Sequence, residues 1–99
     1  MQLLTETQAI AKVNQIIGQS GFGPEYRVYS LRSADWGWVM MWMPKDPSKM
    51  ISGASPYLCH KNGFVREHNE ICHHHNLRND DIDGVIKAFI IEAERRIRI

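Results

Sequence analysis

Cysteine is scarce in this sequence. The chain also has no large excess of positive or negative charge and no long apolar run. Only two cysteines occur, Cys59 and Cys72, and twelve basic against eleven acidic residues leave a net charge of +1. No apolar run approaches the roughly 18 residues that cross a bilayer, and the segment before Thr5 is too short for a secretory signal. We therefore predict a soluble, cytoplasmic protein with free thiols, and neither a membrane nor a nucleic acid as its partner.

Catalytic signatures are missing too. The chain has no Ser-containing nucleophile elbow, no Gly-rich phosphate loop and no His-Glu-x-x-His motif. A nucleophilic dyad would need Cys59 or Cys72 beside one of the five histidines, and the spacing does not indicate which pair would meet. We predict that the protein is not an enzyme and needs no cofactor.

The sequence does contain enough apolar residues, 43%, for one folded domain over residues 1–99. Thr5 and Gln8 have the spacing of a capping box and open a helix that Gly18 is expected to end. Asn79 and two aspartates precede apolar residues that recur every three or four positions. This pattern predicts a second helix over residues 80–97.

Between these helices the apolar period changes to two. Residues 26–31, 36–43, 56–60 and 64–68 have the composition of strands, and Lys-Asn-Gly at 61–63 is typical of a hairpin turn. The order α-β-β-β-β-α predicts the α+β class, with a mainly antiparallel sheet and the helices packed on one face. Because the turn could have two or three residues, the faces of the last two strands stay undecided.

The second of these strands is apolar on both faces. Trp36, Trp38, Met40 and Trp42 alternate along one face, and Val39 begins the apolar series on the other. A central strand packed on both sides would explain this pattern. With both helices on one face, however, the three tryptophans could contact a partner or a second copy of the chain, since Trp and Met are enriched in binding interfaces.

Cysteines and histidines gather in two short stretches, which raises the alternative of a zinc site. The four residues that could supply its ligands are Cys59, His60, Cys72 and His74. Paired zinc ligands are typically separated by about two to four residues, whereas these cysteines each have a histidine as immediate neighbour. Adjacent side chains on a strand also point to opposite faces. We therefore predict no metal site, and a zinc-stabilised small binding module is kept as an alternative function.

Residues 70–79 show no clean period, and the segment over residues 66–78 holds many polar side chains. We expect the polar groups of this segment to be exposed and to contact a protein partner, as the loop over 44–55 also could. The candidate contact residues in it are Arg66, Glu67, His68, Glu70, His73, His74, His75 and Arg78.

Residues 5–68 carry a pattern of a short helix, a strand, a Trp-rich strand, a loop and a Gly-turn hairpin. Its most specific residues are Trp38, Trp42, Gly53, Pro56, Lys61 and Gly63. On these residues the chain resembles the YrhB-like immunity proteins, which neutralise toxins of bacterial polymorphic toxin and contact-dependent growth inhibition systems. The resemblance implies no catalysis, no cofactor and a cognate toxin domain as a tight protein partner. A small homodimeric regulatory protein is a further alternative.

Overall fold

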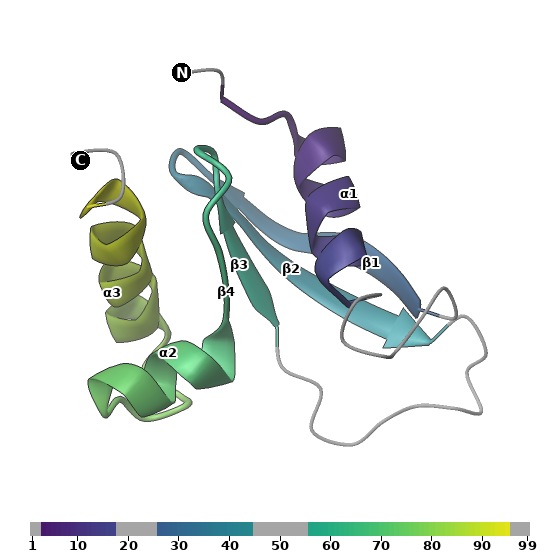
Figure 1. Cartoon of the computed structure of the whole chain (residues 1–99). Coiled ribbons are helices and arrows are strands. Elements are labelled where there is room, and N and C mark those ends of the chain that lie inside the picture. The colour runs from purple at the N-terminus through teal and green to yellow at the C-terminus, as the bar shows by residue number, and fades with distance from the viewer. Residues whose placement is uncertain (1–2, 18–25, 45–55, 96–99) are drawn as a thin grey trace.

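The computed structural model describes residues 3–17, 26–44 and 56–95 (Figure 1). Its elements, in chain order, are α1 (Glu6–Ile17), β1 (Tyr26–Ala34), β2 (Gly37–Pro44), β3 (Tyr57–His60), β4 (Val65–Glu67), α2 (His68–His75) and α3 (Ile82–Arg95). The predicted α+β class is confirmed. The helix expected from 5, the four strands and the helix expected near 80 are all present. Gly18 and the 45–55 part of the loop lie outside the described residues.

The four strands form one antiparallel sheet in the order β1-β2-β3-β4. In the β1–β2 pair Ser30 faces Met40 and Arg32 faces Val39, so Leu31 is an extra, bulged residue. A bulge interrupts the strict alternation of a strand and redirects the side chain at that point. Leu31, on the edge strand β1, consequently has no partner residue on β2.

The β3–β4 hairpin has a three-residue loop, which decides the register left open by the sequence. The His60 amide donates to the Phe64 carbonyl over 2.8 Å, and Cys59 faces Val65 in the ladder. Gly63 completes the loop with φ at 96°, a left-handed conformation that favours glycine. The Lys12 ammonium of α1 donates to the Gly63 carbonyl, so the turn is also tied to the first helix.

Gly37 allows β2 and β3 to approach closely. A Cβ atom at this position would overlap the carbonyl oxygen of Cys59 on the neighbouring strand. A glycine inside a strand commonly marks such a backbone contact. The Gly between Trp36 and Trp38 is therefore required by the pairing of the two strands.

The helices cover opposite faces of the sheet, so the prediction that both pack on one face is wrong (Figure 1). On one face, α1 buries Ala9, Val13 and Ile17 against the strands. On the other face, α3 buries Val85 and Phe89 against Leu58 and the residues around it. We call these the α1 face and the α3 face. A strand with two packed faces explains why β2 is apolar throughout.

Helix α2 was not predicted, because the sequence shows no clean period over residues 70–79. The helix covers His68–His75 and buries only Ile71 and Cys72. Two buried positions in eight residues are too few to give a recognisable apolar period. The helix ends at Asn76, whose left-handed backbone (φ 54°) lets its amide donate to the Cys72 carbonyl.

Both predicted helix starts are confirmed at atomic level. The Thr5 amide donates to Gln8 Oε1 over 2.9 Å, and the Gln8 amide donates to Thr5 Oγ1 over 3.3 Å, which completes the capping box. At the start of α3, Asp81 Oδ1 accepts from the Gly84 amide over 3.0 Å. Among the described residues, no helix combines the length and the apolar composition needed to cross a membrane.

Candidate binding surface

An apolar pocket of about 320 Å³ opens on the α3 face. It lies between α3 and the strands β1, β2 and β3, and its lining residues are Leu31, Val39, Pro56, Leu58, His68, Asn79, Ile82, Val85 and Ile86. Two of them are exposed large apolar side chains, Leu31 at 57% and Ile82 at 50%. Exposed apolar residues that converge on one concavity are typical of a binding site, whereas single scattered ones are not.

The bulge of β1 and the cap of α3 explain how these two side chains reach the same pocket. Leu31 is the extra residue of the bulge, at the edge of the sheet. Ile82 is the first residue of α3, directly after the capping residue Asp81. Leu31 therefore lies at an irregularity of its strand and Ile82 lies at the start of its helix. Neither side chain is buried in the core.

His68 also lines the pocket. Its Nε2 is inaccessible to water and makes no hydrogen bond, and its Nδ1 lies 3.8 Å from Cys72 Sγ. The structure thus brings together one Cys-His pair, which the spacing had not indicated. Burial raises the pKa of the Cys72 thiol, and the nearby Asp81 carboxylate raises it further. A thiol whose pKa is raised is a poor nucleophile at neutral pH because the thiolate is the reactive form.

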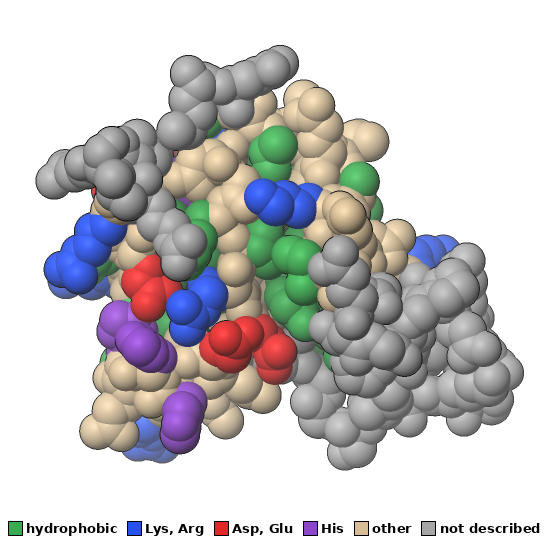
Figure 2. Space-filling model, viewed as in Figure 1, with side chains coloured by type: hydrophobic (Ala, Val, Ile, Leu, Met, Phe, Trp, Pro, Cys, Tyr) green, Lys and Arg blue, Asp and Glu red, His purple; other side chains and the backbone are tan. Residues whose placement is uncertain are grey.

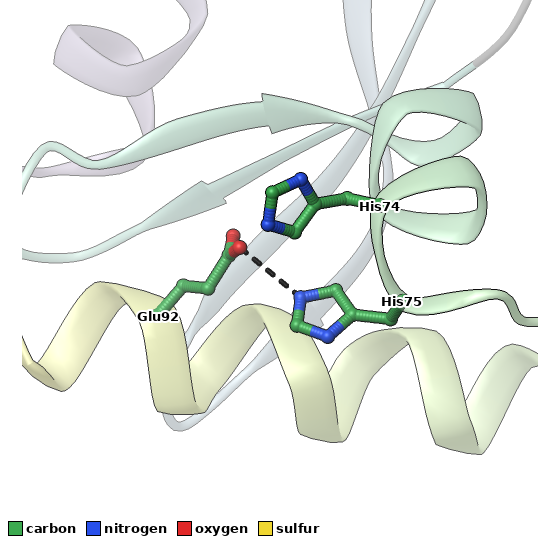
Figure 3. Close-up of side chains that lie close together, drawn as sticks. All are labelled: His74, His75 and Glu92. Carbon is green, nitrogen blue, oxygen red and sulfur yellow. Dashed lines mark hydrogen bonds and ion pairs between the residues drawn. The ribbon is translucent and has the colours of Figure 1, made fainter.

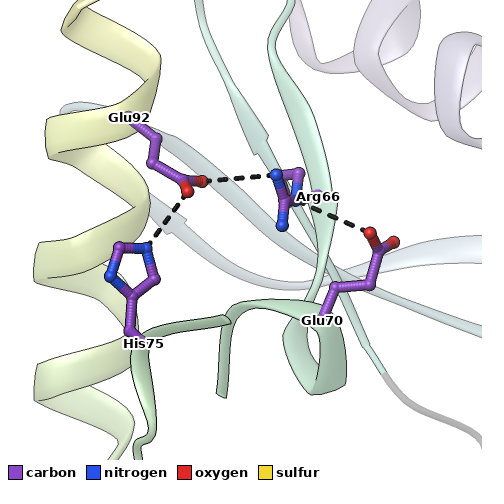
Figure 4. Close-up of polar contacts among 4 residues, drawn as sticks. All are labelled: Arg66, Glu70, His75 and Glu92. Atoms are coloured by element: carbon purple, nitrogen blue, oxygen red, sulfur yellow. Dashed lines mark hydrogen bonds and ion pairs between the residues drawn. The ribbon is translucent and has the colours of Figure 1, made fainter. Parts of the chain in front are cut away.

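A network of charged side chains joins β4, α2 and α3 (Figure 4). Arg66 Nη1 lies 3.7 Å from Glu92 Oε2, and Arg66 Nε lies 3.8 Å from Glu70 Oε2. Glu92 Oε1 lies 3.1 Å from His75 Nε2. Glu92 is the centre of this network and its side chain is only 17% exposed. Half-buried pairs such as these position side chains more firmly than exposed pairs do.

The residues predicted as partner contacts in the 66–78 segment therefore have different surroundings. Arg66, Glu70 and His75 belong to the network. His73 and Arg78 are exposed and lie outside it, with Arg78 paired to Asp80 over 3.2 Å. Figure 2 shows the histidines beside interleaved acidic and basic side chains on one side of the molecule. Polar groups do gather here, but on a helix and a strand end rather than on an irregular segment.

Glu67 and His74 complete that predicted set. Glu67 faces Tyr57 across the β3–β4 ladder and accepts a hydrogen bond from its hydroxyl. Burial raises the pKa of the Glu67 carboxyl, and the carboxylate of Glu70 raises it further. The His74 side chain is exposed, and its ring centroid lies 5.2 Å from that of His75.

The tryptophans predicted to face a partner belong to the core. Trp38 and Trp42 are only 6% and 8% exposed, and both lie in the cluster beneath α1. Trp36 is half-buried and packs edge-on against Phe89, with the ring centroids 5.6 Å apart. The interpretation of Trp38 and Trp42 as surface anchors fails because it assumed an open sheet face that α1 in fact covers.

The alternative zinc set of Cys59, His60, Cys72 and His74 is not assembled. Cys59 lies in the cluster on the α1 face, and Cys72 lies in the cluster on the α3 face. The His60 ring lies 6.4 Å from Phe89, so it points away from Cys59, as expected for strand neighbours. Burial raises the pKa of the Cys59 thiol to about 11. Cys59 is therefore a small apolar core residue.

Two parts of this surface were missed from the sequence. Glu92 was not singled out in the sequence, and the pocket around Leu31 and Ile82 was not expected. A signal for Glu92 existed: it follows Phe89 by three residues and thus borders the buried stripe of α3. No such signal existed for the pocket, because it depends on the bulge and on the register of separate strands.

Comparison of the chain with protein-family models, with curated proteins and with solved structures finds no match. The resemblance to immunity proteins therefore stays a prediction that rests on the residues named for it.

Proposed function

We propose that this protein is a non-catalytic binding domain that takes a protein partner on its α3 face. The observation that carries the proposal is the apolar pocket with Leu31 and Ile82 exposed at 57% and 50%. Protein interfaces have an apolar centre and a polar rim. The pocket supplies the centre, and the polar side chains of α2 and of the α3 N-terminus supply candidates for the rim.

The partner is expected to insert an apolar side chain flanked by basic groups. Three exposed acids, Asp80, Asp81 and Asp83, flank Ile82 in the sequence, and among the described residues Arg78 forms an ion pair with the first of them. This leaves an excess of negative charge at one end of the pocket. Complementary charge at a rim steers association and suppresses wrong partners.

Within this class, the resemblance favours a toxin domain as the partner, so we propose an immunity protein that covers the toxin's active site or a surface near it. Support for the non-catalytic part comes from the two thiols, whose pKa values are raised by burial. The alternative of a zinc-stabilised module loses its support because Cys59 and Cys72 lie in separate clusters. A homodimeric regulator would use the same pocket for a second copy of the chain.

Co-expression with a toxin tests this proposal. A gene for a large secreted toxin should lie directly beside this one, and the chain should restore growth to cells that express the toxin's C-terminal domain. Leu31→Asp should abolish that rescue and the purified complex. Leu3→Asp is the matched control, since Leu3 is 56% exposed but does not line the pocket.

Three results would overturn the proposal. They are the lack of a neighbouring toxin gene, rescue that survives Leu31→Asp, and a stable homodimer of the free chain that Leu31→Asp dissociates. The last result would establish the homodimeric alternative instead, and analytical ultracentrifugation would detect it.

A further inference from the structure

Three side chains from two helices converge beside the network described above (Figure 3). They are His74 and His75 at the end of α2 and Glu92 of α3, and one ligand atom from each lies within 4.8 Å of the others. The closest pair is His75 Nε2 and Glu92 Oε1 at 3.1 Å. In Figure 3 both imidazole rings point toward the carboxylate. This arrangement differs from the Cys/His set considered from the sequence, with which it shares only His74.

The donor atoms suit a divalent transition metal. Two imidazole nitrogens and one carboxylate oxygen are a common set of three protein ligands for Zn²⁺, with the fourth tetrahedral position left open. At Zn–N and Zn–O lengths of about 2.0–2.1 Å, tetrahedral ligand atoms lie about 3.4 Å apart. The 3.1 Å between His75 Nε2 and Glu92 Oε1 is close to that spacing. The His74 side chain is exposed, so a change of its side-chain torsion angles can bring its ring nitrogen to the same spacing.

The surroundings of Glu92 support this role. Arg66 lies 3.7 Å from Oε2, the carboxylate oxygen that does not face His75, so it orients the group while Oε1 points to the histidines. Glu70 lies 3.8 Å from the same guanidinium and offsets its charge. Glu92 Oε2 is inaccessible to water and makes no hydrogen bond within the geometric limits of one. A cation beside this half-buried carboxylate would compensate its desolvation.

The backbone also favours a cation here. The two histidines occupy the last turn of α2, which Asn76 closes in a left-handed conformation. The carbonyl end of a helix carries partial negative charge. The same turn holds His74 and His75 toward α3, where Glu92 is fixed one helical turn beyond the buried Phe89.

We propose that His74, His75 and Glu92 bind one divalent transition-metal ion, Zn²⁺ in the first instance, with an open coordination position toward solvent. The site forms on the folded chain and is not required for folding, because its ligands lie at the surface and the two hydrophobic clusters do not depend on it. The open position accepts water or a donor side chain from another molecule. This inference does not rest on the proposed function.

Zinc titration of the full chain by calorimetry tests the proposal. Wild-type protein should bind one equivalent, and zinc should raise its melting temperature, as any ligand specific for the folded state does. His75→Ala and Glu92→Gln should each weaken binding about 10-fold or more. His73→Ala is the matched control, since His73 is an exposed neighbour in the same tract that is not part of the cluster. It should change the affinity less than about 3-fold.

Glu92→Gln is the decisive variant because a run of three histidines can hold zinc without any folded site. Retained affinity in Glu92→Gln, or an equal loss in His73→Ala, would mean that the His tract alone binds zinc and would overturn the proposal. So would the lack of a one-equivalent event in the wild type. Circular dichroism of each variant confirms that it is folded, and the visible spectrum of bound Co²⁺ gives a second readout of the coordination geometry.

Discussion

The two faces of the sheet differ in how their side chains are packed, although the same strands form both. Beneath α1, nine buried residues of the described part of the chain form an apolar cluster that includes Trp38, Met40 and Trp42. On the α3 face the buried cluster has five residues, and next to it lie an open pocket and a network of charged side chains. The comparison teaches that, in the described part of the chain, more of the fully buried side chains lie on the α1 face. The α3 face has the smaller buried cluster and exposes apolar and polar groups beside it.

Truncation of the α1 face should have the largest effect. Trp38→Ala removes a side chain that is only 6% exposed, and we expect a loss of about 3–5 kcal/mol in the free energy of unfolding. Urea unfolding followed by far-UV circular dichroism measures it. A loss below about 1 kcal/mol would mean that Trp38 is a surface residue after all and that the two faces have been assigned wrongly.

Removal of one helix cap on each face should have an intermediate effect on the free energy of unfolding, and it compares the two faces directly. Thr5→Ala removes the side-chain half of the capping box of α1, and Asp81→Ala removes the cap of α3. Each should lower the free energy of unfolding by about 1 kcal/mol. Similar losses in both variants would indicate that the two helices belong to one cooperative unit. If Asp81→Ala unfolds α3 while α1 stays protected in hydrogen exchange, the α3 face is a separate, weaker unit.

The smallest effect concerns pH and His60. Burial lowers the pKa of this imidazole below its ordinary value of 6.5, Lys61 lowers it further, and Glu94 opposes the shift. Below pH 6.5 the unfolded chain therefore binds a proton that the folded chain does not, so stability is lost as the pH falls. The backbone N–H of Asn62 donates to His60 Nδ1 over 3.1 Å, a contact that requires the unprotonated nitrogen.

His60→Gln isolates this contribution. The variant should lose less stability than the wild type between pH 7 and pH 5, as measured by urea unfolding at each pH. Identical pH dependence in the two proteins would show that His60 titrates alike in the folded and unfolded states.

The sequence predicted the fold class and the starts of α1 and α3 because these depend on local signals. Thr5 with Gln8 and the acid at Asp81 are read within one helical turn, and the hydrogen bonds that they predict are present. Helix α2 was missed because only Ile71 and Cys72 of its eight residues are buried, so its apolar period was absent.

The assignment of faces failed for a different reason. The apolar residues of β2 show that both faces are covered, but no local signal shows which helix covers each face. The sequence did show that the 66–78 segment is rich in polar side chains, and their contact with a partner stays a prediction. Glu92, which pairs with Arg66 and His75, and the pocket at Leu31 and Ile82 were missed because they depend on contacts between distant segments.

The comparison of the two faces is tested most directly by two matched substitutions on one helix. Ile82 and Ile91 are both on α3 and are 50% and 44% exposed, but only Ile82 lines the pocket. The measurement is the dissociation constant of the chain with the toxin domain that the proposed function requires as its partner, for Ile82→Asp and Ile91→Asp. We predict at least about a 10-fold loss for Ile82→Asp and less than about 3-fold for Ile91→Asp, with both variants as stable as the wild type within about 1 kcal/mol. Equal affinities for the two variants would contradict the assignment of binding to the pocket on the α3 face.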